Sequence, residues 1–418
     1  MRELKRGTVR DLRRDNRAAV LWSLYQNQTR PPGPPSLSQP SAGQPSPGRP
    51  LSRLDLTALT GLSAASVTNV IRQLLDEGIV LETGLTDSDG GRPRAMLGMN
   101  PEYGYVIGVD VGETRTRVEL FDLTMTELAK AEYPLNALEH NVDILVRQIL
   151  SGIGSVLSDS GIDPAKVLGV GIGVPGVIEQ GPEVLVHGQT YGWDSVPLGR
   201  LLRQGTDLPL YFDNGAKTMG QAELWFGAGR GTRNAVVVLV GSGVGASLIS
   251  DGSTYRGATS SGAEFGHITV VTGGRKCRCG SAGCLEAYAG AEAILERYGR
   301  PMAARDQEAA LAELLDAAGT SPLAAAILDE TSEYLGAGIG SLINLFNPER
   351  VIIGGWAGLL LSERFLPAIR EFARQHSLRH PFAATSIELG QLGPWAVALG
   401  AATLPVESFL NGALGPAA

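Results

Sequence analysis

The cysteines of this chain constrain its fold most, because all three lie within eight residues, as Cys277, Cys279 and Cys284. His267 stands ten residues before the first of them. Three thiolates and one imidazole are the ligands of a closed tetrahedral zinc site, and the glycines of the Cys-x-Cys-Gly-x-x-Gly-Cys pattern let the loop turn tightly. The alternative is that His267 is an ordinary core histidine and the thiols are free. An odd, clustered set of cysteines favours metal ligands over disulfides, so we predict a structural zinc loop over residues 267–286.

Charge is distributed unevenly along the 418 residues. The net charge is −8, but residues 1–100 carry +4 (13 basic and 9 acidic residues) and the remainder carries −12 (22 and 34). This asymmetry is typical of a basic nucleic-acid-binding module joined to an acidic body. No apolar run reaches the roughly 18 residues that a membrane span needs, and the arginine-rich start has no apolar core like that of a secretory signal. We therefore expect a cytoplasmic protein of two or three domains with no membrane partner.

A helix-turn-helix pattern occupies residues 52–76. Ser52 and Asp55 have the spacing of a capping box, which opens a short helix. Gly61 then supplies a turn, and Ser63 can cap a second helix. The apolar residues of this second helix repeat at helical spacing and predict a buried face: Val67, Val70, Ile71, Leu74 and Leu75.

The opposite face of the second helix carries small hydrogen-bonding side chains and a cation, which suit base edges and phosphates. A strand and a basic hairpin follow, and the hairpin ends in two arginines that can reach a minor groove. The candidate DNA contacts are Ser66, Thr68, Asn69, Arg72, Arg92 and Arg94. The alternative is an amphipathic helix pair that packs on a neighbour, but the basic hairpin and the charge asymmetry favour DNA binding.

A first helix is predicted over residues 15–28, and residues 30–50 separate it from the helix-turn-helix pattern. This separating stretch is rich in Pro, Ser, Gly and Gln, so it cannot bury enough apolar surface to offset the entropy of ordering. We predict that it is a mobile loop. With the first helix and the basic hairpin, the pattern predicts a winged helix-turn-helix domain over residues 1–98.

Strand and helix patterns alternate over residues 99–418, which predicts an α/β body. A strand at residues 106–110 leads into a turn that contains Gly112. Two further glycine-rich turns are predicted at residues 169–176 and 241–245. Such turns let backbone amides approach an anion, but they also occur for turn geometry alone.

Two carboxylates flank the cysteine cluster: Glu264 in Glu-Phe-Gly-His, and Glu286 two residues after the last cysteine. A rigid metal loop would hold them where they can accept hydrogen bonds from adjacent sugar hydroxyls. They can equally be the partners that orient His267 on a metal ion. The residues alone leave both interpretations open.

The order of these motifs resembles the ROK family of repressors, uncharacterised reading frames and sugar kinases. The matching stretches are Asn16-Arg17-Ala18-Ala19-Val20-Leu21, Gly61-Leu62-Ser63, Gly91-Arg92-Pro93, Asp110-x-Gly112-x-Thr114, Gly173-Val174-Pro175-Gly176, Glu264-x-Gly266-His267 and Cys277-x-Cys279-Gly280-x-x-Gly283-Cys284-x-Glu286. The resemblance implies a two-lobed, actin-like (RNase H-like) sugar-kinase body behind the winged helix-turn-helix, with structural zinc and a homodimeric or homotetrameric assembly. It also implies that a sugar bound between the lobes alters the fit to operator DNA. Four residues would form this sugar site: Asn214, Glu264, His267 and Glu286.

The chain departs from the family's kinases at the base that takes the proton from the sugar hydroxyl. That base is the Asp of Asn-Asp-Ala-Asn, and the matching stretch here is Asn214-Gly215-Ala216-Lys217. Gly215 has no side chain, and loss of a general base commonly costs about 10² to 10⁴ in rate. Lys217 adds a cation to the cleft. We therefore expect no phosphoryl transfer and no ATP cofactor.

A second departure concerns the ligand. The family usually places a sugar-contacting Asn before a Trp, whereas this chain has Gln189-Thr190-Tyr191-Gly192-Trp193. This leaves open whether the ligand is an unusual sugar, a derivative of one, or none.

We predict a DNA-binding transcriptional regulator, a repressor, whose body senses a small carbohydrate. Two recognition helices of a dimer lie about one DNA turn apart, or a multiple of it, so the operator is expected to be palindromic. The alternative is an ATP-dependent sugar kinase with an accessory DNA-binding module, in which Asp213 supplies the missing carboxylate. A third hypothesis is a scaffold without ligand that binds DNA constitutively.

Overall fold

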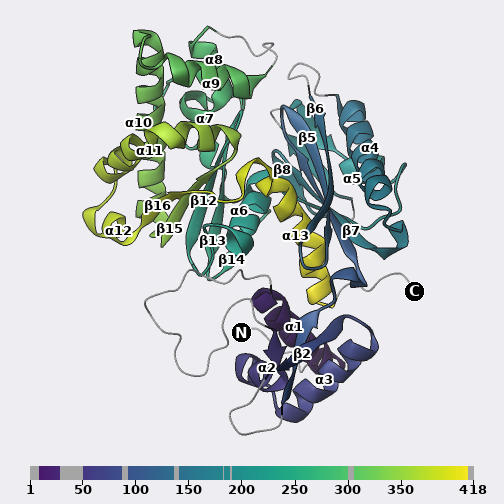
Figure 1. The fold of residues 1–418 in the computed structure, drawn as a ribbon. Helices are drawn as coiled ribbons and strands as arrows, with labels where there is room; N and C mark the ends of the chain where they lie inside the picture. The colour runs from purple at the N-terminus through teal and green to yellow at the C-terminus, as the bar shows by residue number, and fades with distance from the viewer. Residues whose placement is uncertain are drawn as a thin grey trace.

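A computed structural model of the chain describes residues 9–28, 50–86, 93–135, 141–181, 183–188, 191–299 and 306–412. These residues form a small N-terminal domain and a body of two lobes that stand side by side (Figure 1). The mobile loop predicted for residues 30–50 and the DNA contact predicted for Arg92 fall outside the described residues, except for Pro50.

The N-terminal domain is a winged helix-turn-helix. Its elements are α1 (Val9–Gln28), β1 (Leu51–Ser52), α2 (Arg53–Thr60), α3 (Ala64–Asp76), β2 (Val80–Thr86) and β3 (Arg94–Met99). The predicted capping box of Ser52 and Asp55 is present at the start of α2, and Gly61 ends that helix with a left-handed φ of 68°. The chain then turns by 119° into α3, the angle range of DNA-binding helix pairs. The three strands pair in the order β1-β3-β2 and form the wing.

The first lobe is built on a five-stranded sheet in the order β11-β7-β4-β5-β6. Strands β11, β7 and β4 run parallel to one another, whereas β5 and β6 are antiparallel to their neighbours. A small second sheet has the order β10-β9-β8. The elements are β4 (Tyr105–Val111), β5 (Arg115–Asp122), β6 (Glu127–Pro134), α4 (Val142–Ser160), β7 (Val167–Val174), β8 (Val177–Glu179), β9 (Leu185–Gly188), β10 (Trp193–Val196), α5 (Leu198–Leu202), β11 (Leu210–Asn214) and α13 (Ala396–Leu410).

The glycine-rich turn predicted at residues 169–176 is wrong for most of its length, because these glycines lie inside the buried strand β7. They serve packing against α13. A Cβ on Gly171 would clash with the carbonyl oxygen of Ala401, and a Cβ on Gly108 in β4 would clash with that of Ala398. Glycine in these strands therefore lets the backbone of α13 press directly onto the sheet.

The second lobe has a five-stranded sheet in the order β14-β13-β12-β15-β16. Its elements are α6 (Gly215–Phe226), β12 (Ala235–Val240), β13 (Val244–Ser250), β14 (Ser253–Thr254), α7 (Glu286–Ala289), α8 (Ala291–Arg297), α9 (Gln307–Ala317), α10 (Pro322–Phe346), β15 (Arg350–Gly354), α11 (Trp356–Gln375), α12 (Arg379–Ala384) and β16 (Ser386–Leu389). The predicted glycine turn after β12 is present and joins β12 to β13. Two such lobes with these sheet orders confirm the predicted actin-like α/β body.

Helices α6 and α13 lie between the lobes and extend toward the N-terminal domain (Figure 1). Their backbones touch, since a Cβ on Gly400 of α13 would clash with the carbonyl oxygen of Thr218 in α6. The C-terminal residues of α13 share one apolar core with α1, α2 and α3, and this core includes Val406, Phe409 and Leu410. The N-terminal domain is thus packed on the body.

Taken singly, none of the described helices has both the length and the apolar composition to cross a bilayer. Two bent pairs, α2 with α3 and α9 with α10, meet these requirements only when each pair is counted together.

Candidate functional site

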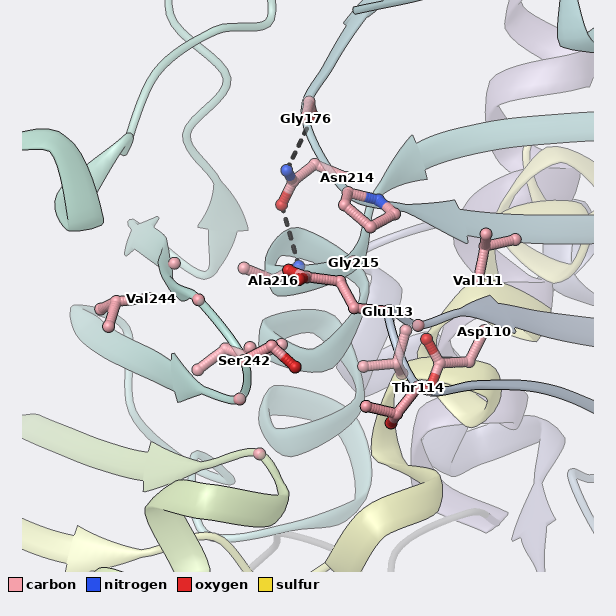
Figure 2. Close-up of a pocket in the computed structure, with 18 of the residues that line it drawn as sticks. Asp110, Val111, Glu113, Thr114, Gly176, Asn214, Gly215, Ala216, Ser242 and Val244 are labelled. Carbon is pink, nitrogen blue, oxygen red and sulfur yellow. Dashed lines mark hydrogen bonds between the residues drawn. The ribbon is translucent and has the colours of Figure 1, made fainter. Parts of the chain in front are cut away.

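A cavity of about 340 Å³ opens between the two lobes, a size within the range of small-molecule sites. Its wall in the first lobe is the turn between β4 and β5, with Asp110 and Glu113. Its wall in the second lobe is the turn after β12, with Ser242 and Val244, and the N-terminus of α6 closes the space between them (Figure 2). The two glycine turns that the sequence indicated therefore face each other across one cleft.

Asn214 is the N-cap of α6 and fixes how this helix meets the cleft. Its Oδ1 accepts hydrogen bonds from the backbone N–H groups of Ala216 and Lys217 at 2.9 and 3.3 Å, and its Nδ2 donates to the carbonyl oxygen of Gly176 at 2.8 Å (Figure 2). Gly215 follows as the first residue of the helix. A Cβ on Gly215 would meet only ordinary contacts, the nearest at 3.6 Å. The position has room for a side chain and carries none.

The structure brings the four predicted sugar-contacting residues, Asn214, Glu264, His267 and Glu286, together in the wall of this cleft. Burial raises the pKa of Glu264, and the nearby His267 and Lys217 offset only part of this effect. Burial alone would also raise the pKa of Glu286, but the adjacent guanidinium of Arg278 holds it below its usual value. Of these two carboxyls, Glu264 is therefore easier to protonate than usual, whereas Glu286 is ionised.

Asp213 does not line the cleft. It is buried, its Oδ2 forms an ion pair with Arg256, and its Oδ1 accepts a hydrogen bond from the N–H of Asn214 at 2.8 Å. Lys217 is buried as well, and its ammonium group donates to the carbonyl oxygen of Ser260. The carboxylate that the kinase hypothesis needs is thus held by a cation outside the cavity.

The sequence did not indicate several charged and aromatic residues that line the same cavity: Glu113, His187, Arg278 and Trp356. Glu113 and Arg278 join the lobes, as does Arg115 of the turn between β4 and β5. Arg278 in the cysteine loop forms a two-point ion pair with Glu113, and Arg115 forms ion pairs with Asp306 and Glu308 at the start of α9. No local motif signals these contacts, because the partners lie far apart in the chain.

Asp110 lies at the base of the first turn, where its side chain is 13% exposed. Burial raises the pKa of Asp110 to about 7, although Arg117, 3.9 Å away, lowers it. Glu132 accepts a hydrogen bond from the same Arg117 at 2.7 Å and raises the pKa of Asp110 further. Asp110 is therefore neutral below about pH 7.

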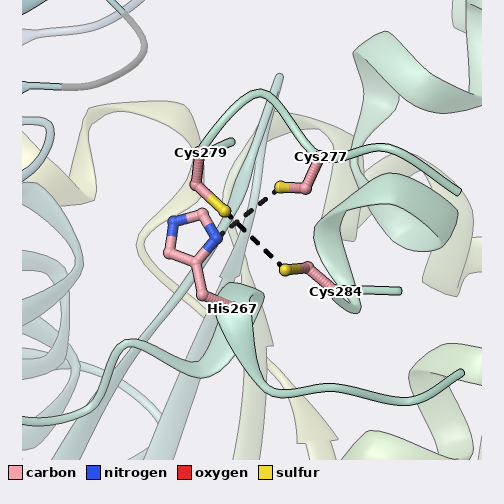
Figure 3. Close-up of side chains that lie close together, drawn as sticks. All are labelled: His267, Cys277, Cys279 and Cys284. Carbon is pink, nitrogen blue, oxygen red and sulfur yellow. Dashed lines mark hydrogen bonds between the residues drawn. The ribbon is translucent and has the colours of Figure 1, made fainter. Parts of the chain in front are cut away.

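His267, Cys277, Cys279 and Cys284 form a compact cluster, in which one ligand atom from each residue lies within 4.8 Å of the others (Figure 3). The Sγ atoms of Cys279 and Cys284 are 3.7 Å apart, and the Sγ of Cys277 is 3.8 Å from Nδ1 of His267. Tetrahedral zinc with Zn–S bonds of roughly 2.3 Å places its sulfurs roughly 3.8 Å apart. The donor set and its spacing therefore fit one tetrahedral metal ion.

The glycines of this loop adopt the backbone conformations that the sequence pattern requires. Gly280 and Gly283 have φ values of 91° and 80°, which glycine adopts without the steric cost of a side chain. A Cβ on Gly283 would also clash with the carbonyl oxygen of Val271. The loop ends at Cys284, and Glu286 begins α7 two residues later.

The predicted DNA-facing residues of α3 are largely accessible. Thr68, Asn69 and Arg72 are exposed, as is Arg94 at the start of β3. Ser66 is half-buried. Its hydroxyl lies 2.9 Å from the hydroxyl of Ser63, and the Oγ of Ser63 also accepts a hydrogen bond from the backbone N–H of Ser66. Ser66 therefore helps to start the helix. On the opposite face Val67, Val70, Ile71 and Leu74 are buried as predicted, whereas Leu75 is half-buried.

The N-terminal domain meets the body through aromatic side chains. Trp225, near the end of α6, contacts Trp22 and Tyr25 of α1 with ring centroids 5.5 and 5.7 Å apart. The indole Nε1 of Trp22 also donates to Oδ1 of Asn411, just after α13, at 2.9 Å. Both interlobe helices therefore end on the first helix of the N-terminal domain.

A winged helix-turn-helix fused to a two-lobed body with a cysteine loop beside its cleft defines a class of sugar kinase-like regulators. Residues 106–407 match the model of the ROK family, and the chain belongs to this family. It is 32% identical over 373 residues to the xylose repressor of Caldicellulosiruptor bescii, a match that covers 86% of this chain and 93% of that protein.

The solved structures that this chain resembles include both a transcriptional regulator and sugar kinases. The crystal structure of a ROK family transcriptional regulator, a homolog of the Escherichia coli Mlc protein, superposes with a TM-score of 0.73 at 25% identity and covers 96% of this chain and 97% of that one. A ROK family glucokinase from Streptomyces griseus, in complex with glucose and AMPPNP, gives a TM-score of 0.61 at 26% identity. That match covers 99% of the glucokinase but 72% of this chain, so the regulator matches a larger share of this chain than the glucokinase does.

Proposed function

We propose that this chain is a DNA-binding transcriptional repressor whose body binds a carbohydrate effector and transfers no phosphate. The observation that carries the proposal is the placement of α6. Its N-cap, Asn214, lines the cleft, and Trp225 near its other end packs on α1 of the DNA-binding domain. A ligand that displaces the start of this helix acts on the position of the DNA-binding domain.

The cleft supports sensing rather than phosphoryl transfer. Gly215 offers no base beside the proposed sugar site, and Asp213 is engaged by Arg256 outside the cavity. Proton transfer needs a basic group within hydrogen-bonding reach of the reacting hydroxyl. Asn214, Glu264, His267 and Glu286 remain as hydrogen-bonding groups for a sugar.

The DNA-binding role rests on the winged helix-turn-helix and on the exposed polar face of α3. Thr68 and Asn69 are proposed to contact base edges, and Arg72, Arg92 and Arg94 to contact phosphates or a minor groove. Each protomer offers one recognition helix, so a homodimer or homotetramer would bind a palindromic operator with half-sites about one DNA turn apart or a multiple of it.

We further propose that the cysteine cluster holds structural zinc. When bound, the ion would cross-link the loop that carries Arg278 and precedes Glu286. Four protein ligands leave no open coordination position, which distinguishes a structural from a catalytic zinc site. The ion's contribution would be to fix the second lobe's side of the cleft.

Two measurements test the proposed function against the kinase alternative. Operator sequences would be selected from a random DNA pool with the full-length protein, and ATP consumption would be measured separately with xylose, glucose and N-acetylglucosamine. The proposal expects a palindromic consensus and no sugar-dependent ATP turnover. Sugar-dependent turnover that Asp213→Ala abolishes would establish the kinase alternative instead.

A further inference from the structure

Arg278 connects the two lobes inside the cleft. Its Nη1 and Nη2 donate to Oε2 and Oε1 of Glu113 at 2.6 and 2.9 Å. The cysteine loop of the second lobe is therefore hydrogen-bonded to the β4–β5 turn of the first lobe. The same guanidinium donates from Nε to Glu286 at 2.9 Å and from Nη1 to Glu292 at 2.7 Å. One cation therefore holds three carboxylates.

The guanidinium also lies against the glycine turn of the second lobe. A Cβ on Gly243 would clash with Nη2 of Arg278, and a Cβ on Gly241 would lie 3.3 Å from the indole Nε1 of Trp356. A glycine turn beside an arginine fork is a favourable place for the oxygens of a phosphate. Here the oxygens at the fork belong to Glu113, whose side chain is 12% exposed.

We propose that Glu113 is a specificity-determining residue that occupies an anion subsite formed by Arg278 and residues 241–243, and so excludes phosphate-bearing ligands from this half of the cleft. A guanidinium has five N–H donors, and the four contacts above direct four of them at carboxylates. A phosphate would have to displace Glu113 from the fork. It would then face three negative charges around one positive charge, and like charges at this distance repel.

This inference goes beyond the proposed function, because it concerns anions rather than sugars and holds whether or not a sugar binds. It assigns to Glu113 a role that no local motif signals. The residue lies between Gly112 and Thr114 in the Asp-x-Gly-x-Thr turn, the position from which a side chain reaches across to the opposite lobe. The ion pair also joins the lobes without any nucleotide.

The test measures binding of inorganic tripolyphosphate to the full-length protein by calorimetry, without DNA or sugar. The wild type is expected to bind none in the millimolar range. Glu113→Gln is expected to bind with a dissociation constant at least tenfold below the highest concentration at which the wild type shows no binding, and Glu113→Gln with Glu292→Gln more tightly still. Adding Arg278→Gln to this pair should abolish the gain, because the proposed acceptor is then gone.

Glu308→Gln is the matched control, because it removes the same charge from the other interlobe contact without touching Arg278. It should leave tripolyphosphate binding at the wild-type level. Should Glu113→Gln not fold, Glu113→Ser carries the same test. Wild-type binding as tight as that of the variant, no gain in the variant, or an equal gain in Glu308→Gln would each overturn the proposal.

Discussion

The indole of Trp225 meets the indole of Trp22 edge to face, with ring centroids 5.5 Å apart and an interplanar angle of 84°. This contact joins the end of α6 to the first helix of the DNA-binding domain. The N-cap of α6, Asn214, lies in the cleft wall, and twelve helical residues span about 18 Å. A single stiff element thus reaches from the proposed sugar site to the DNA-binding domain.

Replacement of Trp225 by Leu is expected to weaken the communication between the two sites. Operator affinity should lose most of its dependence on sugar, while sugar affinity itself should change little. In a double-mutant cycle with Trp22→Leu, the unfolding free energies should show a coupling of about 0.5–1.5 kcal/mol, as for other aromatic pairs. Tyr334→Leu, at an aromatic contact remote from α1, should leave the sugar response intact, and an equal loss there would contradict this role.

Two substitutions on the proposed DNA-facing surface should have different effects, one on affinity and one on sequence specificity. Arg72→Ala should lower affinity for all sequences and reduce the slope of log affinity against log salt by about 1, because one phosphate contact is lost. Asn69→Ala should instead relax specificity, costing about 1–3 kcal/mol of discrimination at one base pair. Binding is measured by fluorescence anisotropy at several salt concentrations. Arg374→Ala, an exposed arginine of α11 paired with Glu371, is the control, and an unchanged slope for Arg72→Ala would rule out its phosphate contact.

Loss of the metal tests whether the cysteine cluster holds a structural zinc ion. The purified protein should contain one zinc ion per chain, and Cys279→Ser should lose it and lower the thermal unfolding midpoint, because residues 277–284 then lack their cross-link. Sugar affinity should fall as well, since Glu286 follows this loop directly. Ser281→Ala, within the same loop, should retain the ion. Zinc is measured by atomic emission, and a metal-free wild-type protein of undiminished stability would disprove this site.

Asp110 predicts a dependence of stability on pH. Its pKa is raised from 3.8 to about 7, mainly by burial, so the folded state keeps a proton that the unfolded chain releases. The contribution of Asp110 to the free energy of unfolding is therefore fully present below about pH 4, falls as the pH rises to about 7, and is lost above about pH 7. The pKa shift corresponds to at most about 4 kcal/mol. Asp110→Asn should therefore gain stability relative to the wild type between pH 5 and pH 8 in urea unfolding. Asp159→Asn, at an exposed position, should not, and a pH-independent difference for Asp110→Asn would refute the assignment.

The sequence predicted those features whose chemistry is local. The capping box of Ser52 and Asp55, the cysteine loop and the two turns that face the cleft all depend on residues a few positions apart. The glycines of β7 were misinterpreted as a turn, because the reason for them is the backbone of α13, more than 200 residues later.

The contacts that the sequence did not reveal are tertiary. Arg278 and Glu113 are 165 residues apart, and Trp22 and Asn411 are 389 apart. An arginine between two cysteines has no periodic or motif signature that distinguishes an interlobe contact from a solvated charge. Such partners become visible only when the fold places the two lobes around one cleft.

The most direct test of the account is a pair of titrations with the full-length protein and its selected operator. Operator affinity is measured with and without saturating sugar, and sugar affinity with and without operator. The account predicts that both affinities change by the same factor, of about 5- to 150-fold, because binding linkage is reciprocal, and that no sugar phosphate forms when ATP is added. A sugar that binds in the cleft and leaves operator affinity unchanged, or that becomes phosphorylated, would contradict it.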